Sequence, residues 1–363
     1  MRNSENLGDD RSVPLEGADS RASDYRYAFT VFTATHDRAR SLHRPYQSLL
    51  SQTLRDFEWL IVDDGSTDGT ADMVRQWQSS APFPIRYVYQ EHAHKHIALR
   101  RGVAEARGRL FVCLDSDDEC VPTALERFLF HWNSIAPEKR SEFNSLMSLC
   151  QTQAGDSCCT RFPEDVMDVC HLDMLYRYRF HGESWFCHTT DALREVPFPD
   201  EYRGIFFPEG IVLNRIARGH KTRYFNEVLR IYWVDGPSLT KEGLFKNTFA
   251  ARMENMARLN DEIDYFRYYP SRFFRSSVHY ARFSFHQGVP VLHQIRDLHN
   301  ALAKSLCLAA TPLGRALYLR DRRRSSTASS TGSADPAIDH VPADRTGIRA
   351  QHSGPAPSRP DSK

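Results

Sequence analysis

Apolar and polar positions follow two alternating periods between Tyr27 and Phe130. Short apolar runs rich in β-branched and aromatic residues predict strands, and apolar residues spaced three to four positions apart predict helices between them. The predicted strands are Tyr27–Thr35, Phe57–Val62, Ile85–Tyr89 and Arg109–Leu114, and the predicted helices are Ser41–Thr53, Asp68–Gln78 and His96–Ala106. This order predicts an α/β fold with a mostly parallel sheet flanked by helices. Ligands of such sheets bind at the carboxyl ends of the strands.

Two of the predicted strands end in aspartates. Asp63 and Asp64 follow one apolar strand, and Asp115, Asp117 and Asp118 follow another. Side chains alternate along an extended backbone, so Asp115 and Asp117 project to one side and can share a cation, with Asp118 available at the turn. Oxygen ligands of this kind suit Mg²⁺ or Mn²⁺, which take further ligands from water or a substrate diphosphate. The alternative for each cluster is a solvated turn that caps the next helix.

Composition and missing motifs narrow the class of function. The formal net charge is +1, so no global field attracts nucleic acid. No GxGxxG motif follows a strand and no GxxxxGK[ST] motif occurs, which argues against a Rossmann dinucleotide site and a P-loop. The eight cysteines include no CxxC pair, which indicates free thiols. We find no secretory signal and no long uncharged apolar run, so the sequence predicts a cytoplasmic protein.

Four motifs, in this order and spacing, carry a family resemblance: TATHDR, SLLSQTLRDFEWLIVDDGSTDGT, KHIALRRGVAEARG and FVCLDSDDE. Together they resemble the family 2 glycosyltransferases, which have a GT-A fold. The resemblance is strong from Tyr27 to about Glu126 and weaker to about Pro237. It implies a nucleotide-diphosphate-sugar donor, with a UDP-sugar as the leading class, a Mn²⁺ or Mg²⁺ ion on the DxD acids, and inversion at the anomeric carbon.

The resemblance also implies roles for the residues that hold the nucleoside. Thr33, Thr35 and Asp64 would bind the base and ribose, and Asp63 would support that loop or also contact the nucleoside. The chain departs from the family pattern after the first strand, where His36 and Asp37 replace a common Tyr-Asn pair.

Further residues would contact the diphosphate and the metal. Lys95 and Arg101 match the basic positions of the family, so either could face the diphosphate. Asp115 and Asp117 match the DxD motif, with Asp118 as a further candidate ligand. Arg100 stands where the family carries Asn, which puts donor identity in doubt more than the class of reaction.

An inverting transfer requires one carboxylate that accepts the proton of the attacking hydroxyl. Glu209, in the segment FFPEGIVLNRIA, is the candidate because family members with a related FIPE segment carry their acid there. Asp200 and Glu201 are the next candidates. The alternative for Glu209 is a glutamate that stabilises the start of a helix through its dipole.

His92, His94 and His96 alternate with other residues in the segment HAHKH. Such spacing could bind zinc, but the segment matches a loop that leads into a helix in the family. We expect a polar loop or a lining of the donor pocket.

The remaining chain predicts helices at about 247–260, 265–285 and 292–318, followed by the basic run RDRRR at 320–324. The predicted organisation is a disordered N-terminus (1–24), a GT-A domain (25–240), a helical module (241–320) and a disordered tail (321–363). Within the GT-A domain, residues 25–130 form the nucleotide-sugar and metal half, and residues 131–240 form the acceptor half. Truncation after about Tyr318 is expected to leave a folded enzyme.

The helical module has two open interpretations. Its amphipathic helices and flanking cations would suit the inner face of a membrane, where lipid-linked acceptors are found. A module that packs against the catalytic domain is the alternative.

These features predict an inverting, metal-dependent glycosyltransferase that acts on a saccharide or lipid-linked acceptor, in the synthesis of a cell-surface polysaccharide or glycolipid. A sugar-1-phosphate nucleotidyltransferase and a non-catalytic nucleotide-sugar-binding relative are the alternatives.

Overall fold

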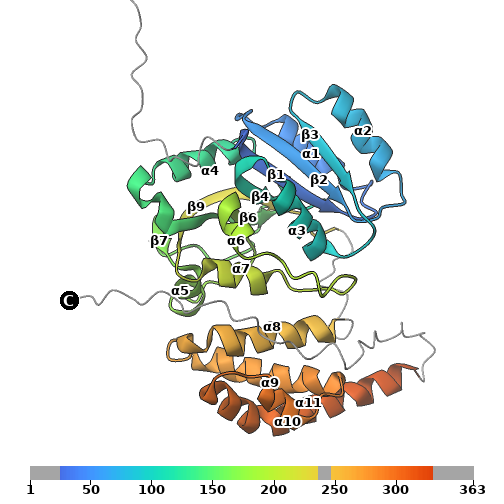
Figure 1. Cartoon of the computed structure of the whole chain (residues 1–363), viewed down its shortest axis with the longest axis vertical. Coiled ribbons are helices and arrows are strands. Elements are labelled where there is room, and N and C mark those ends of the chain that lie inside the picture. Colours follow the sequence, from blue (N-terminus) through green and yellow to red (C-terminus); the bar gives the residue numbers. More distant parts are fainter. Residues whose placement is uncertain (1–24, 236–246, 330–363) are drawn as a thin grey trace, which may run out of the picture.

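The computed structural model describes residues 25–235 and 247–329 (Figure 1). The expected disorder of residues 1–24 and of most of the tail therefore lies outside the described residues. The strands are β1 (Tyr27–Thr35), β2 (Phe57–Asp63), β3 (Ile85–Tyr89), β4 (Gly108–Cys113), β5 (Glu119–Cys120), β6 (Phe143–Thr152), β7 (Val166–Val169), β8 (Ser184–Thr189) and β9 (Lys221–Tyr232). The helices of the sheet domain are α1 (His43–Leu50), α2 (Thr70–Ser80), α3 (Lys95–Glu105), α4 (Ala124–Asn133), α5 (His171–Tyr176), α6 (Thr190–Glu195) and α7 (Gly210–Ala217), with a 3₁₀ turn at Pro137–Glu142.

The described strands form one nine-stranded sheet in the order β3-β2-β1-β4-β8-β6-β9-β5, and β7 also pairs with β9. Strands β1 to β4 are parallel to one another, and β6 and β9 run in the same direction as these four. Strands β5, β7 and β8 run the opposite way. The predicted mostly parallel sheet is therefore confirmed, with antiparallel strands added in its second half.

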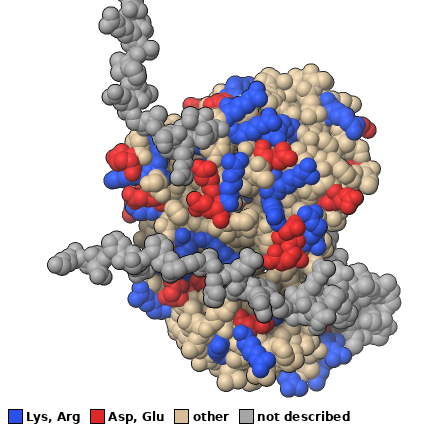
Figure 2. Space-filling model, viewed as in Figure 1, with Lys and Arg blue, Asp and Glu red and all other residues tan. Residues whose placement is uncertain are grey.

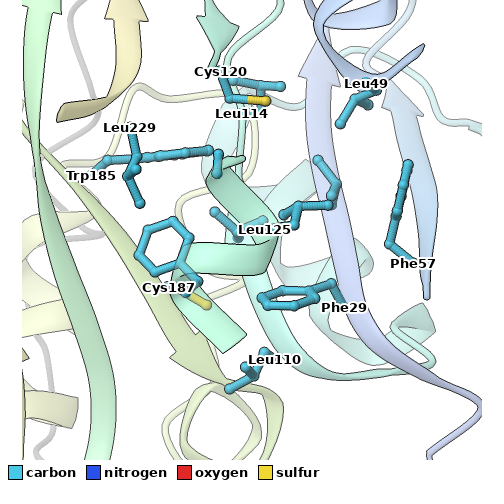
Figure 3. Close-up of a cluster of buried hydrophobic side chains, with 14 of the residues drawn as sticks. Phe29, Leu49, Phe57, Leu110, Leu114, Cys120, Leu125, Trp185, Cys187 and Leu229 are labelled. Atoms are coloured by element: carbon cyan, nitrogen blue, oxygen red, sulfur yellow. The ribbon is translucent and has the colours of Figure 1, made fainter. Parts of the chain in front are cut away.

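Apolar side chains cover both faces of this sheet. On one face, Phe29 and Trp59 pack with Leu49 of α1, Leu125 of α4 and their neighbours (Figure 3). Each buried Leu or Phe contributes roughly 1.5–3 kcal/mol relative to an exposed side chain. The burial of both faces explains why residues Trp59 to Val62 of β2 are a continuous apolar run rather than an alternating one.

The opposite face of the sheet holds α3, α6 and α7. Gly102 lets α3 approach β1 closely, because a Cβ atom at this position would overlap the ring of Phe32. Ile211 and Val212 anchor the start of α7 in the same apolar cluster. The first residues of α3 and α7 are thus held on one face of the sheet.

A helical module follows the sheet domain and consists of α8 (Thr248–Asp261), a 3₁₀ turn (Ile263–Tyr265), α9 (Pro270–His286), α10 (Val291–Arg296) and α11 (Ala301–Ser329). Helix α8 contacts α7 and α9, and α11 packs on α9. Tyr176 of α5 is buried in the same apolar cluster as Phe273 and Tyr280 of α9. In Figure 1 the module lies below the sheet domain, with α10 and α11 on its far side. Across the described residues, we find no helix that is both long and apolar enough to span a membrane.

The predicted boundary at residue 320 is wrong, because α11 continues to Ser329. Asp321 is 1% exposed and lies against α9, where its carboxylate accepts a hydrogen bond from Arg282 Nε at 2.6 Å. His286 Nε2 lies 3.2 Å from the same carboxylate. The RDRRR segment therefore contributes a buried ion pair and is not a solvated tail.

Truncation after Tyr318 is consequently expected to destabilise the protein, contrary to the expectation from the sequence. A chain that ends after residue 318 loses Asp321, and we expect a loss of about 2 kcal/mol in the free energy of unfolding. We expect this loss to be smaller than the loss on breaking a deeply buried ion pair, because the end of α11 can relax. The effect is measured by urea unfolding of three proteins: the chain that ends after residue 318, a chain that ends after residue 329, and the full-length Asp321→Asn variant. Equal stability of the two truncated chains would contradict it.

Candidate active site

The parallel topology brings three loops to one edge of the sheet. Strand β1 lies between β2 and β4, so the carboxyl ends that carry Asp64 and Asp115 flank the end of β1. Lys95 is the first residue of α3, which follows β3. Glu209 immediately precedes α7. Because α3 and α7 share one face of the sheet, their first residues meet at this edge.

The centre of the site is a line of alternating charges. Lys95 Nζ lies 2.9 Å from Asp115 Oδ1 and 3.5 Å from Glu209 Oε1. Burial acts to lower the pKa of Lys95, but the two carboxylates outweigh it and raise this pKa well above its usual value. Lys95 is therefore a fixed cation at neutral pH, positioned between the strand β4 loop and the start of α7.

Arg230 of β9 continues this line on the other side of Asp115. Its guanidinium is 5% exposed, donates to Asp115 Oδ2 at 2.7 Å through Nη2, and donates to Asp118 Oδ2 at 2.7 Å through Nε. Burial opposes ionisation of Asp115, yet Lys95 and Arg230 hold its pKa far below the usual range. Burial instead raises the pKa of Asp118 to about 6, despite the opposing effect of Arg230.

Asp117 differs from its two neighbours, because its carboxylate forms no ion pair with Lys95 or Arg230. Burial and the nearby charge of Asp115 raise its pKa. The main-chain oxygen of Asp117 accepts from Arg44 Nη1 at 3.2 Å, and Arg44 in turn stacks over Trp233 at 4.0 Å. The surrounding contacts thus fix the loop and leave the carboxylate available for a ligand.

The acids that follow β2 are held by their own loop. Asp64 is 3% exposed, and its carboxylate lies within 2.7–2.9 Å of Gln90 Nε2, the Ala93 N–H and His92 Nδ1. Asp63 is fully buried and accepts from the Ser66 N–H at 2.8 Å and from the Tyr87 hydroxyl. The contacts of Asp63 are those of a residue that supports its loop. A nucleobase that binds the Asp64 carboxylate must share this carboxylate with His92 or displace the His92 side chain.

Comparison with known proteins gives a match to the sequence model of one family, described as glycosyl transferase family 2, over residues 30–136. This segment belongs to glycosyl transferase family 2. It contains β1 to β4 and the loops that carry Asp64, Lys95, Asp115 and Asp117, so the charged site described above lies largely within the family 2 domain.

Relatives of known sequence are also named as glycosyltransferases. An uncharacterized glycosyltransferase of Nostoc sp. is 38% identical over 100 residues, which cover 28% of this chain and 31% of the relative. The chain thus matches about a third of the length of the first curated relatives, 31% and 35% for the first two. A Campylobacter jejuni protein named GalNAc(5)-diNAcBac-PP-undecaprenol beta-1,3-glucosyltransferase is 22% identical over 294 residues, or 77% of this chain and 88% of the relative.

The fold agrees with this assignment. The structure of S. aureus TarS residues 1–349 in complex with UDP-GlcNAc has a TM-score of 0.55 and 14% sequence identity, covering 81% of this chain and 91% of TarS 1–349. The predicted GT-A fold is therefore confirmed, including its mostly parallel sheet.

The structure brings together some of the predicted site residues and separates others. Lys95, Asp115 and Glu209 are in direct contact. Arg101 instead lies near Glu105 at 3.9 Å and donates to the Tyr89 main-chain oxygen at 3.4 Å. Of the two predicted basic residues, Lys95 and not Arg101 therefore lies beside the DxD acids.

Thr33 and Thr35, the two threonines of β1 predicted to bind the donor, differ in their hydrogen bonds. Thr33 is fully buried, donates to the Leu114 main-chain oxygen at 2.7 Å and accepts from Trp59 Nε1 at 3.0 Å. These contacts engage the Thr33 hydroxyl within the sheet and tie β1 to its neighbours, and the role of Thr33 in donor binding stays a prediction. Thr35 is 3% exposed, and its hydroxyl has no hydrogen-bond partner among the described residues.

The three candidate metal ligands fit a divalent cation unequally. Asp118 does not fit, because it is 1% exposed and its oxygens already accept from Arg230 and from the Trp233 N–H at 2.9 Å. Asp117 fits better, since its carboxylate is not paired with Lys95 or Arg230. Asp115 retains lone pairs beyond its two ion pairs. In the part of the chain that the structure describes, no group of three or more His, Cys, Asp or Glu residues is placed to hold a metal.

The histidines of the HAHKH segment do not form a metal site with one another. The rings of His92 and His36 lie against each other at a tilt, with centroids 4.3 Å apart, and His92 also lies against Asp64. His96 is 1% exposed and packs against Phe207, and burial lowers its pKa to about 4. His92 therefore lies in a polar loop beside Asp64, whereas His96 packs in the interior, and a lining of the donor pocket stays a prediction.

Two residues of the site were missed from the sequence alone. Arg230 joins Asp115 and Asp118, and Trp233 contacts both Arg44 and Asp118. A single arginine within the otherwise apolar end of β9, VLRIYW, is the signal that could have identified Arg230. The alternative acid Asp200 is 52% exposed and pairs with Arg203 at 2.7 Å, outside the line of charges.

Proposed function

We propose that the protein is an inverting glycosyltransferase that moves a sugar from a nucleotide-diphosphate-sugar to an acceptor hydroxyl. The observation that carries this proposal is the contact of Lys95 with both Asp115 and Glu209 at the edge of a family 2 domain. It places a cation, a DxD acid and a separate carboxylate in one site. A transfer reaction needs these three elements for the leaving diphosphate and the attacking hydroxyl.

The donor would lie over the ends of β1, β2 and β4. Asp64 and the unpartnered hydroxyl of Thr35 are the groups that would face the nucleoside, with His92 adjacent. Lys95 would lie near the diphosphate. A UDP-sugar is the leading donor class, supported by the UDP-GlcNAc named for the TarS structure of the same fold.

Asp117, with Asp115 as a second oxygen ligand, would hold Mn²⁺ or Mg²⁺. When bound, the ion would neutralise charge that develops on the departing diphosphate.

Glu209 would act as the general base. Its carboxylate takes the proton of the acceptor hydroxyl while the hydroxyl oxygen forms a bond to the anomeric carbon and the bond from that carbon to the diphosphate breaks. Attack from the face opposite the leaving group inverts the configuration. The Glu209 side chain is 25% exposed, which leaves it accessible to an acceptor.

The acceptor would be a saccharide or a lipid-linked saccharide of cell-surface polysaccharide or glycolipid synthesis. A lipid-linked acceptor is supported by the name of the Campylobacter relative, which specifies a PP-undecaprenol substrate. The site would then work in the cytoplasm, at or near the inner face of the membrane.

A donor screen tests the proposal. We expect UDP-, GDP- or dTDP-sugars with Mn²⁺ to raise the melting temperature, because ligands that bind the folded state stabilise it, by about 2.7 kcal/mol at a hundredfold excess over Kd. Slow hydrolysis of the stabilising donor, measured with a coupled assay for the nucleotide product, would show turnover. Stabilisation without hydrolysis or transfer to any acceptor would favour a non-catalytic relative. Formation of a nucleotide-sugar from a sugar-1-phosphate and a nucleoside triphosphate would favour a nucleotidyltransferase.

Asp117→Asn is expected to reduce metal-dependent donor hydrolysis by about a hundredfold, because a carboxamide is a poorer ligand for a hard divalent cation. Hydrolysis rates across a Mn²⁺ titration measure the effect. Asp165→Asn is the control, since Asp165 is 94% exposed and remote in sequence from the site. Wild-type rates and metal dependence in the Asp117 variant would remove this residue from the metal site.

A further inference from the structure

Helix α11 has two contrasting faces. One face packs on the rest of the module through buried residues at helical spacing, namely Ala303, Cys307, Ala310, Gly314 and Asp321. Gly314 allows the close approach, because a Cβ atom there would lie 2.7 Å from Ala281 Cβ of α9. This packing fixes the rotation of α11 about its axis and so determines which side chains face outward.

The outward face carries large apolar side chains. Leu302, Leu308, Leu313 and Leu319 are 40%, 63%, 48% and 45% exposed. With about 3.6 residues per turn, they occupy an arc of about 140° opposite the buried residues. Four of the eleven exposed large apolar side chains of the described residues thus gather on one helix. A continuous exposed apolar face of this kind indicates an interaction surface.

The charges around this face have one sign. Arg315, Arg320, Arg322, Arg323 and Arg324 are exposed, and Lys304 is half-buried. Asp321, the single acidic residue of α11, is buried against α9 and paired with Arg282. In Figure 2, blue side chains outnumber red ones along the visible lower margin of the helical module. The outward side of α11 is therefore apolar along its length and cationic at its last described turns.

We propose that this face of α11 lies in the plane of a bilayer that contains anionic lipids. Leucines on one side of a helix with arginines at its border and end are suited to the boundary between acyl chains and headgroups. Each arginine near an anionic surface adds electrostatic attraction. Figure 1 places α11 on the side of the module away from the sheet, so contact with a bilayer leaves the sheet edge accessible.

A second copy of the chain fits this face less well. A symmetric contact would place two arginine-rich helix ends of the same charge against each other or against the same leucine face. An anionic lipid surface instead complements both the apolar and the cationic parts. The proposal concerns a surface remote from the candidate active site and does not depend on the proposed transfer reaction.

Vesicle flotation of the full-length protein tests the proposal. We expect binding to phosphatidylcholine vesicles that contain 30% phosphatidylglycerol and binding at least tenfold weaker to pure phosphatidylcholine. Raising the salt concentration should weaken the first interaction. Equal binding to both vesicles, or no binding to either, would overturn the proposal.

Matched variants locate the contact. Leu308→Glu with Leu313→Glu should weaken binding to anionic vesicles by at least about tenfold, and Arg320→Gln with Arg324→Gln by roughly thirtyfold. The control for the leucine variant is Phe130→Glu, which alters a side chain on α4 that is 54% exposed. The control for the arginine variant is Arg55→Gln with Arg107→Gln, which removes two exposed charges of the sheet domain. Circular dichroism and thermal unfolding should show that all variants remain folded.

Unchanged binding of both α11 variants, or equal losses in the controls, would overturn the assignment to α11. Light scattering provides an independent measurement. A wild-type dimer that the Leu308→Glu and Leu313→Glu substitutions convert to a monomer would assign the face to a second copy of the chain and would also overturn the proposal.

Discussion

Substitution of Glu209 by Gln is expected to reduce turnover by about 10²–10⁴-fold while the affinity for the donor stays within about threefold of wild type. General acid–base groups contribute a rate factor of this size. The amide cannot accept the hydroxyl proton, but its oxygen can still accept a hydrogen bond from Lys95, which lies 3.5 Å away. The change therefore removes the base and retains much of the local geometry. Turnover at saturating donor and calorimetric donor affinity measure the two quantities separately.

Glu201→Gln is the matched control for this experiment. It introduces the same chemical change in an exposed neighbour that was the alternative candidate from the sequence. We expect its turnover to remain close to wild type. A large loss in Glu201→Gln with little effect in Glu209→Gln would reverse the assignment of the base. Parallel losses of donor affinity and turnover in Glu209→Gln would show that Glu209 mainly positions Lys95.

The local pattern of the first half of the chain was sufficient to predict its elements. Strand β1 occupies the predicted residues Tyr27–Thr35, and β2 extends the predicted strand by one residue to Asp63. These elements depend on apolar runs and on turn residues that are close in sequence. Parallel pairing then brings their carboxyl ends together. This is why the grouping of the β2 and β4 acids at one edge could be anticipated.

Contacts between distant segments could not be predicted in the same way. Arg230 and Asp118 are 112 positions apart, and their pairing depends on β9 lying beside β5 in the sheet. The sequence suggests that Asp115 and Asp117 share a cation, with Asp118 as a further candidate, but Arg230 pairs with Asp115 and Asp118 and so gives the three acids different environments. Asp321 is a similar case, because its partner Arg282 belongs to another helix, 39 positions away. The sequence pattern alone does not identify the partner of a charged residue when that partner is remote along the chain.

Substitution of Arg230 by Met is expected to lower the free energy of unfolding by about 3–5 kcal/mol at pH 8. Removal of one partner of a buried ion pair leaves the other charge without compensation, and this penalty is of that size. Asp115 would retain Lys95 at 2.9 Å, whereas Asp118, which is 1% exposed, would retain the Trp233 N–H. The cost should therefore arise mainly at Asp118. Urea unfolding with a chelator present measures it without a contribution from bound metal.

The pH dependence of this loss identifies its source. In the folded wild type the pKa of Asp118 is raised to about 6, above the ordinary value of about 4 that applies to the unfolded chain. A carboxyl with a raised folded pKa favours folding when protonated, and this contribution is lost as the pH rises through the folded pKa. Removal of Arg230 raises that pKa further, so the difference from wild type should be largest at pH 8 and smaller at pH 5.

The double variant Arg230→Met with Asp118→Asn provides the control for the last experiment. The amide oxygen of Asn can still accept from the Trp233 N–H, but no charge is then buried at this position. We expect the double variant to recover a large part of the stability lost by Arg230→Met at pH 8 and to show little of its pH dependence. A deficit that is the same at pH 5 and pH 8, or no recovery in the double variant, would mean that Arg230 stabilises the site through packing against Tyr232, whose ring centroid lies 5.6 Å away, rather than through charge.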